Sequence, residues 1–218
     1  KKAKKIEKIC FEEMLELSSL GAKVLQIRSV EFASKYEMPI RVLSSFNSTG
    51  GTLITKEESS LESAVISGIT CTDDDSKLIL RDVPDTPGIA AKILSPISDA
   101  GIDIDVIVQN VGSDKLTDFT FTVKNEHSDK AAKILNDLVQ TLGGGEIELV
   151  KDVSKVSVVG VGMKSHAGVA AQMFKALAEK QINIDMISTS EIKISVVVSK
   201  DKSKAAVMAL HDEFELDK

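Results

Sequence analysis

The chain has 218 residues, of which 43% are hydrophobic, so it can bury the cores of one or two domains of roughly 100 residues each. Its net charge of −6, its aromatic content of 4% and its lack of Trp exclude the basic, aromatic-rich surface that nucleic-acid binding requires. No apolar run approaches the ~20 residues of a membrane span, so no membrane partner is expected. The two cysteines, Cys10 and Cys71, form no C-x-x-C pair, which argues against a disulfide framework or a zinc site and favours reduced thiols in the cytoplasm.

The first 60 residues differ in pattern from the rest of the chain. The chain starts with Lys1 rather than Met, which is typical of a fragment or a processed form, and the basic start lacks the apolar stretch of a signal peptide. Apolar spacing predicts a helix over 11–20 that ends at Gly21, followed by a second short helix. A strand is expected over 38–46, and "NSTGGT" (47–52) is expected to be a loop or linker.

After about residue 60, strands and helices alternate with short polar turns. Strands are predicted at 64–71, 77–82, 102–108, 117–123 and 146–151, and helices at 87–100 and 128–142. The pattern then restarts, with strands at 155–161, 183–188 and 193–198 and helices at 168–180 and 202–213. The first copy reads β-α-β-β-α-β, which predicts an α+β fold with ferredoxin-like antiparallel sheets and helices on one face. The second copy stops one strand short, so we expect 64–71 to complete its sheet.

The two copies match residue by residue at an offset of 80. Gly88 corresponds to Gly168, Ala90 to Ala170, and several Ile and Asp positions follow. Core packing alone explains most of the matching Ile and Ala positions. The glycines need another reason, because a Gly in the first turn of a helix costs stability but lets a ligand approach the backbone N–H groups.

The first copy has the features of an anion-binding helix start. Asp85 and Thr86 are candidate N-caps, Pro87 is expected at the first helical position, and Gly88 follows. The exposed amides, reinforced by the helix dipole, would hold a carboxylate group. These amides belong to Gly88, Ile89 and Ala90.

Nearby side chains would complete a site for a free amino acid. Asp85 would hold an ammonium group, and Asp105 and Gln109, on or just after the following strand, would add polar contacts at the same end. The competing interpretation, at least as plausible from these residues, is that Asp85 merely caps its helix.

Catalytic motifs are weak. Ser165 and His166 are adjacent, but no acid is spaced to orient the histidine, and "GVGMKS" (160–165) lacks the spacing of a phosphate-binding loop. No cluster with metal-ligand spacing occurs. We therefore predict no catalytic and no metal-binding residues.

Many ordered segments resemble bacterial aspartate kinase over essentially the entire chain. They are "MLELSSLGAKVL", "RSVEFA", "SSF", "DTPGIAAKI", "DVIVQNV", "KVSVVGVGMKSH", "GVAA", "INIDMISTSEIKISVVV" and "ALHDEFEL". The resemblance implies that 1–60 are a C-terminal remnant of the catalytic domain plus a linker. It implies one ACT domain at 73–152 and a second built from 61–72 and 153–218.

The resemblance also implies a function. The nucleotide- and aspartate-binding motifs of the family are missing, so the chain resembles a separate regulatory subunit or an excised regulatory region, with ATP and Mg²⁺ bound only by the intact enzyme. It implies allosteric feedback inhibition by lysine and/or threonine, bound between the ACT domains of a homodimer, and a catalytic chain or domain as partner. The family's effector contacts fall on Asp85, Gly88, Ile89, Ala90, Asp105 and Gln109 in the first ACT domain, and on Val169, Ala170, Asn183, Ile184 and Ser190 in the second.

The sequence also bears on two other function classes. The alternative within the family is a chain that itself phosphorylates L-aspartate with ATP. A ferredoxin-like metal carrier or RNA binder would need a C-x-x-C loop or exposed sheet aromatics, and the sequence has neither.

Overall fold

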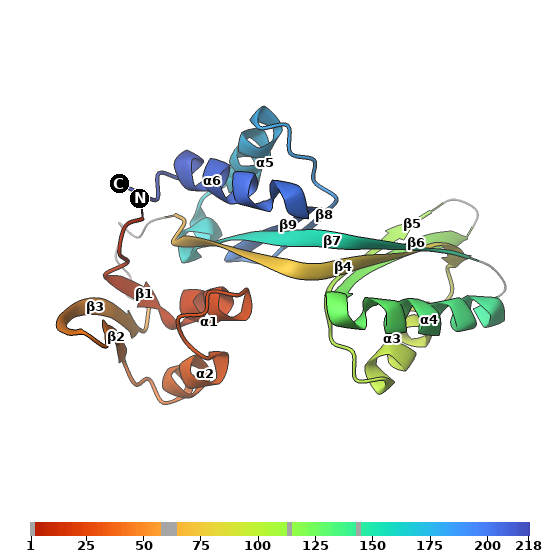
Figure 1. Ribbon diagram of the computed structural model, residues 1–218, viewed down its shortest axis with the longest axis horizontal. Helices are drawn as coiled ribbons and strands as arrows, with labels where there is room; N and C mark the ends of the chain where they lie inside the picture. The colour runs from red at the N-terminus through yellow and green to blue at the C-terminus, as the bar shows by residue number, and fades with distance from the viewer. Residues whose placement is uncertain (1–2, 58–64, 113–114, 143–144) are drawn as a thin grey trace. The chain divides into compact units, whose positions relative to one another are not determined.

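The computed structural model describes residues 3–57, 65–112, 115–142 and 145–218, and it divides into two compact units (Figure 1). Unit 1 contains Lys1–Thr72 and Lys155–Lys218, and unit 2 contains Asp73–Ser154. The domain boundary expected near residue 60 and the strand start expected at Ala64 lie outside the described residues.

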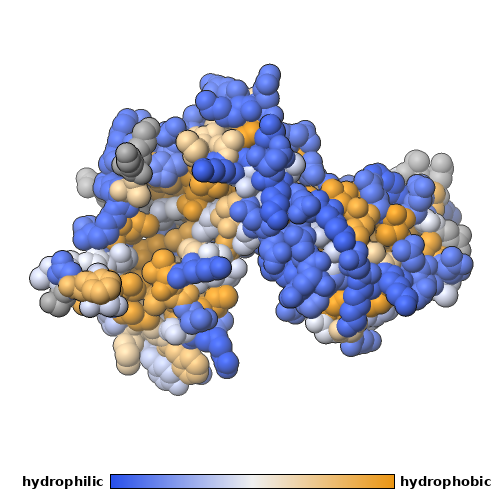
Figure 2. Space-filling model, viewed as in Figure 1, coloured by the Kyte–Doolittle hydropathy of each residue, from blue (hydrophilic) through white to orange (hydrophobic). Residues whose placement is uncertain are grey.

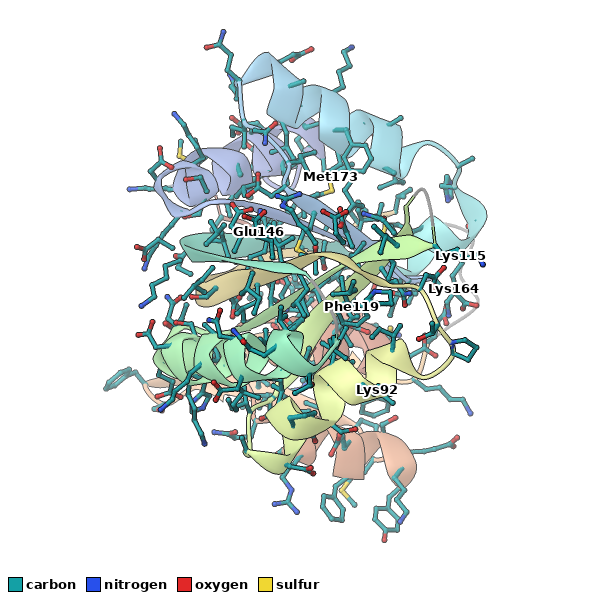
Figure 3. All side chains as sticks on the ribbon, turned by 90° about the vertical axis from the view of Figure 1, so that its right-hand side faces the viewer. Lys92, Lys115, Phe119, Glu146, Lys164 and Met173 are labelled. Carbon is teal, nitrogen blue, oxygen red and sulfur yellow. The ribbon has the colours of Figure 1, made fainter. Side chains whose placement is uncertain are left out.

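Unit 2 is a four-stranded antiparallel sheet with two helices on one face (Figure 1). Its strand order is β5-β6-β4-β7, where the elements are β4 (Gly68–Pro84), α3 (Ile89–Asp99), β5 (Ile104–Val111), β6 (Leu116–Lys124), α4 (Asn125–Leu142) and β7 (Glu146–Val159). The core between the sheet and the helices includes Phe119 (Figure 3). Phe121 belongs to the same cluster, and both side chains are almost fully buried.

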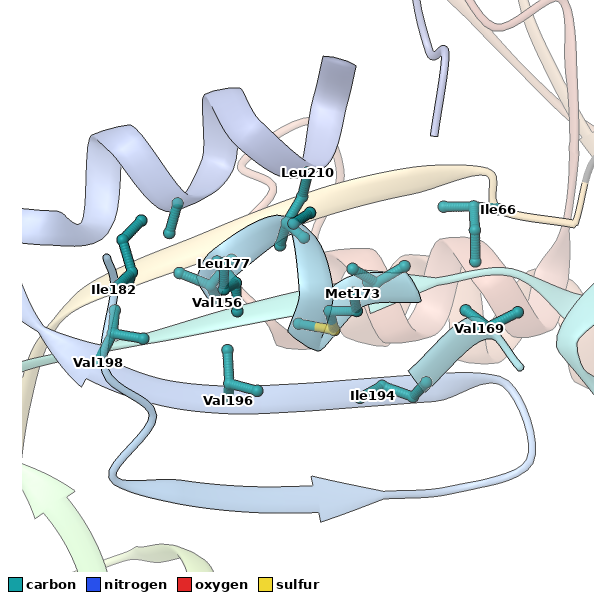
Figure 4. Packing of buried hydrophobic residues seen from close by; sticks show 13 residues of the cluster. Ile66, Val156, Val169, Met173, Leu177, Ile182, Ile194, Val196, Val198 and Leu210 are labelled. Carbon is teal, nitrogen blue, oxygen red and sulfur yellow. The ribbon is translucent and has the colours of Figure 1, made fainter. Parts of the chain in front are cut away.

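The second sheet of this kind lies in unit 1, with the strand order β4-β7-β9-β8. Its further elements are η1 (Val161–Ser165), α5 (Val169–Glu179), β8 (Met186–Thr189), β9 (Lys193–Ser199), η2 (Lys200–Lys202) and α6 (Ser203–Glu213). Ile66 packs with Val169, Met173 and Ile194 in its core (Figure 4), and the Ser67 N–H donates to Val159 O at 2.8 Å. The ferredoxin-like fold is therefore confirmed, and the first part of β4, with the residues just before it, supplies the strand that the second copy lacks.

Two pairs of predicted strands are single long strands. β4 covers both 68–71 and 77–82, and β7 covers both 146–151 and 155–159. The polar run "TDDDS" (72–76) lies between the two predicted strands, but two of its side chains are paired within the sheet: Asp75 is 3% exposed and contacts Lys124 at 2.7 Å, and Asp73 accepts from Ser154 at 2.6 Å. Satisfied charges let a strand continue through a segment whose composition is typical of a turn.

The N-terminal part of unit 1 has its own small sheet and two helices. Its elements are β1 (Lys8–Cys10), α1 (Phe11–Ser19), α2 (Ile27–Lys35), β2 (Ile40–Ser44) and β3 (Asn47–Thr55), with the strand order β1-β3-β2. The prediction of a loop at 47–52 is wrong, because "NSTGGTLIT" pairs with β2 on one side and β1 on the other. Large apolar side chains remain at the surface of this part (Figure 2): Val24, Ile27, Phe32, Tyr36, Met38, Leu43 and Phe46.

None of the helices in the part of the chain that the structure describes is long and apolar enough to cross a membrane.

Candidate functional site

The first candidate site lies at the start of α3. Gly88 is the N-cap, with a left-handed φ of +91°, and the helix begins at Ile89 without a side-chain cap. The predictions that Asp85 or Thr86 caps the helix and that Pro87 opens it are therefore wrong. The left-handed turn at Gly88 starts the helix instead, and the Thr86 carbonyl accepts the Ile89 N–H at 3.0 Å.

This geometry moves the anion-binding amides one residue along the chain. Ile89 uses its amide locally, and its side chain is 5% exposed in the core. The amides of Ala90 and Ala91 occupy the next positions, where an α-helix offers no internal acceptor. A Cβ added at Gly88 would meet nothing within 4 Å, so the space next to Gly88 at the start of the helix is open. The helix start can therefore accept a carboxylate group.

Asp85 and Gln109 lie toward the same end of the unit 2 sheet. The Asp85 N–H donates to Lys115 O at 2.8 Å, just before β6, and Pro84 pairs with Leu116. Gln109 lies near the end of β5, the strand that leads toward this turn, and both side chains are exposed. A ligand at the α3 start therefore has a carboxylate and an amide within the same region.

Asp105 lies elsewhere within the chain. It occupies the first part of β5, in the register shift between Ile104 and Ile107, four residues or roughly 13 Å from Gln109 along the strand. The expectation that Asp105 and Gln109 contribute at the same end is therefore wrong for a single chain.

The second candidate site repeats this helix start in unit 1. Gly168 is the N-cap of α5, with φ +99°, and a Cβ there would also meet nothing within 4 Å. The first helical hydrogen bond runs from the Gln172 N–H to Gly168 O at 3.0 Å, as it does from Lys92 to Gly88 at 3.0 Å. The duplication in sequence is thus a duplication of backbone geometry.

Apart from those at the start of α5, the remaining residues of the second site lie toward opposite ends of β8, as Asp105 and Gln109 lie toward opposite ends of β5. Val169, 7% exposed, packs in the core, and Ala170 is half-buried beside it. Ser190 follows β8 directly, on the strand end that corresponds to Gln109 in the first copy.

Asn183 and Ile184 come before β8, and they correspond to the region around Asp105. The Asn183 amide donates to Asp185 Oδ1 at 3.0 Å, and the Ile184 side chain packs against the core of unit 1. Within one chain these two residues therefore lie apart from Ser190.

The two sites differ in charge. Asp85 of the first site corresponds to Ser165 in the second at the 80-residue offset. A carboxylate beside the helix start suits a ligand that carries an ammonium group, whereas a hydroxyl offers only neutral hydrogen bonds. The two helix starts therefore differ in the charge that they would present to a ligand.

The structure places Ser165 and His166 in a helix-start turn. His166 Nδ1 lies 2.8 Å from Gly162 O and 3.1 Å from Ser165 Oγ. Because the ring is held by a backbone carbonyl, it lacks the carboxylate that would orient a general base. Among the residues described, no group of three or more His, Cys, Asp or Glu is placed to hold a metal ion.

A cavity of about 640 Å³ lies in unit 1. Its lining includes Lys4, Lys56, His211 and Phe214, and none of the predicted site residues. Its mixed charges identify no ligand class.

Two exposed isoleucines were not recognised from the sequence. Ile107 on β5 is 48% exposed and Ile187 on β8 is 45% exposed, and both strands are sheet edges. Core packing, which explains most of the matching Ile positions, does not explain these two. The available signal was alternation, because each follows a residue that is buried, Val106 or Met186.

Comparisons with known proteins agree with this architecture. A family model described as "ACT domain" matches residues 78–142, and a second ACT-domain model matches residues 156–214. Aspartate kinase of Pseudomonas fluorescens (strain SBW25) is 57% identical over 216 residues, which are 99% of this chain and 52% of that protein. The chain thus spans about half the length of the curated relatives it matches.

Solved structures identify which half is matched. The regulatory subunit of aspartate kinase from Thermus thermophilus is 38% identical, with a TM-score of 0.65, and the match covers 69% of this chain and 99% of that subunit. A chain from the structure of aspartokinase α and β subunits is 42% identical, with the same TM-score of 0.65 and the same coverage. The chain therefore belongs to the aspartate kinase family and contains its regulatory part, with two ACT domains.

Proposed function

We propose that the chain senses lysine and/or threonine and mediates allosteric feedback inhibition of aspartate kinase in the cytoplasm. The observation that carries the proposal is the duplicated helix start, in which a left-handed glycine leaves open space beside amides that attract a carboxylate. An amino acid brings both the carboxylate and the ammonium group that Asp85 is suited to hold.

The complete sites are proposed to form between two copies of the chain. If an edge strand pairs antiparallel with an edge strand of a second copy about the exposed Ile107, Asp105 of one chain comes opposite Gln109 of the other. Pairing about Ile187 likewise brings Ile184 opposite Ser190. A dimer would thus unite the residues that a single chain separates.

The catalytic partner is proposed to cover the apolar surface of the N-terminal part. Phe32, Tyr36 and Met38 are each more than half exposed, and Phe46 is fully exposed. Clustered exposed apolar residues of this size mark protein contacts. ATP and Mg²⁺ would then bind to that partner, and this chain alone would not phosphorylate L-aspartate. A kinase assay of the isolated chain with ATP, Mg²⁺ and L-aspartate tests this point, since turnover would favour the catalytic alternative.

The decisive experiment is calorimetric titration of Gly88→Asp with L-lysine and L-threonine, singly and together. The new carboxylate would fill the open space and repel the ligand's own, which should weaken binding at the first site roughly thirty-fold to a thousand-fold. Asp tolerates a left-handed φ better than most residues, so the loss of stability should be about 1 kcal/mol.

Gly101→Asp is the matched control. Gly101 follows the same helix, has φ +71°, and also faces open space. It therefore reproduces the charge and the backbone strain at the other end of α3. If Gly88→Asp binds both amino acids as tightly as Gly101→Asp does, the α3 start is merely a helix start.

A further inference from the structure

One face of α1 carries three glutamates that contact the frame of the second candidate site. The frame is defined as η1, the start of β9 and the residues just before β4. The central one, Glu13, is 5% exposed. Its Oε1 accepts the Val161 N–H at 2.9 Å and the Ser67 Oγ–H at 2.5 Å, and its Oε2 accepts the Cys10 N–H at 3.4 Å. A buried carboxylate thus joins α1 to the segment before β4 and to η1.

The two flanking glutamates form ion pairs with the same part of unit 1. Glu12 Oε2 lies 3.0 Å from Lys164 Nζ in η1, a residue labelled in Figure 3. Glu16 Oε2 lies 2.9 Å from Lys193 Nζ at the start of β9, and both side chains of this pair are only about a quarter exposed, at 26% and 24%.

These partners adjoin both sides of the second candidate site. On one side, η1 leads directly into the Gly168 turn that opens α5. On the other side, the Ser190 N–H donates to the carbonyl of Lys193 at 2.8 Å. The β8–β9 hairpin is also bonded to the start of η1, because the Gly160 N–H donates to Ile192 O at 3.0 Å. The segments on both sides of the site therefore contact side chains of α1.

The contact between α1 and this frame is largely buried, and one side of it borders the cavity that Glu13 and Val161 help to line. Cys10, Val161 and Ile192 form a small buried cluster beside Glu13. Glu13 occupies the third position of α1, where the N-terminal amides and the helix dipole stabilise a carboxylate. If the charge of Glu13 is removed, its buried hydrogen-bond donors keep only a weaker acceptor. The resulting loss of stability is larger than for the same change at the surface.

We propose that Glu13, assisted by Glu12 and Glu16, is a positioning residue that couples the second candidate site to α1. A change in the Gly168 turn or in the Ser190 hairpin is transmitted to α1 through these contacts, and loosening α1 loosens both sides of the site. This inference deepens the proposed function and rests on it for the identity of the ligand. Coupling of this kind is reciprocal, so a change in α1 must alter ligand affinity if the ligand alters α1.

The first candidate site differs from the second in the hydrogen bonds that fix its loop. Its loop is held by the Asp85 N–H to Lys115 O and by the Ile89 N–H to Thr86 O, all within unit 2. It therefore serves as the internal reference for any effect on the second site.

Amide hydrogen exchange on the full chain tests the coupling without a ligand. In Glu13→Gln, amides over 161–171 and 190–193 should exchange about tenfold faster or more, in keeping with the loss of a charge-assisted hydrogen bond. Amides at the α3 start should be unchanged. Glu31→Gln, an exposed glutamate on α2, is the matched control and should change neither region.

Two outcomes would overturn the proposal. One is faster exchange in α1 alone, and the other is an equal increase at the α3 start, which would indicate a merely structural loss. If Glu13→Gln fails to fold, Glu16→Gln on the partly exposed pair applies the same test to 190–193.

Titration separates this inference from the proposed function. In a Gly88→Asp background, L-lysine and L-threonine are titrated into chains with Glu13 or with Gln at that position. A shift in dissociation constant of about threefold or more supports reciprocal coupling, and unchanged affinity with faster exchange contradicts it. If neither amino acid binds the unmodified chain, the proposed function fails while the exchange experiment still decides the coupling.

Discussion

Gly88 and Gly168 each allow a sharp turn into a helix and leave open space at the start of that helix. A left-handed φ near +90° reverses the chain into a helix, and only glycine adopts it without strain. The same missing Cβ leaves the adjacent amides open. The sequence repeat predicted that both glycines lie at helix starts, as they do, but it did not predict their conformation, because an N-cap Ser, Thr or Asp is the commoner way to start a helix.

Cys10 should be an unreactive thiol. Burial raises the pKa of its thiol from the ordinary value of 9.0 to about 12, and the hydrogen bond from the Glu13 N–H to Sγ only partly offsets this effect. Because the thiolate is the reactive form, alkylation by iodoacetamide at pH 8 should label the half-buried Cys71 well before Cys10. Mass spectrometry of the labelled peptides checks the order, and rapid labelling of Cys10 in the folded chain would contradict it.

The raised pKa also gives Cys10 a pH dependence of stability. In the unfolded chain the thiol ionises near pH 9, whereas in the folded chain it stays protonated until about pH 12. Stability from the neutral thiol is therefore fully present below pH 9 and is lost as pH rises toward 12. Urea unfolding of Cys10→Ala should show a shallower decline over this range than the parent chain does. Equal slopes would show that other groups govern the alkaline transition.

At the scale of elements, hydrophobic periodicity predicted the four α-helices of the two ACT domains (α3, α4, α5 and α6) to within about three residues, since each has one apolar face, but it did not predict the short 3₁₀ helix η1. The long strands were not predicted, because Asp75 and Ser154 are polar residues whose partners lie far away in sequence. The separation of Asp105 from Gln109 was also missed, since it depends on sheet register. Local patterns thus predict elements, and pairing decides where the side chains meet.

Two methionines give a matched test of packing. Met173 on α5 is fully buried in the core of unit 1 (Figure 4), whereas Met208 on α6 is 59% exposed. Met173→Ala should lower the free energy of unfolding by about 2–5 kcal/mol, and Met208→Ala should lower it by about 0.5 kcal/mol or less. Chemical denaturation measures both, and similar losses would contradict the assigned core.

At the scale of the whole molecule, the exposed isoleucines should control association. Sedimentation of the parent chain should show twice the 23.4 kDa monomer mass, because the edge strands β5 and β8 present Ile107 and Ile187 to a second copy. The double variant Ile107→Lys and Ile187→Lys should sediment as a monomer, since paired like charges oppose edge-to-edge contact.

Met208→Lys is the control for the added charge, because it replaces an exposed apolar residue on a helix. A parent chain that stays monomeric at micromolar concentration with lysine and threonine present would contradict the dimer.

The continuity of β4 and β7 imposes an order of events during synthesis. Every residue of unit 2 leaves the ribosome as one uninterrupted stretch, so this unit can close as soon as Ser154 has emerged. The strand that begins near Ser67 must wait for its partner Val159, more than 90 residues later. A slow-folding variant of unit 2 would therefore also delay the burial of Ile66, and prolong the exposure of a strand edge that is prone to aggregation.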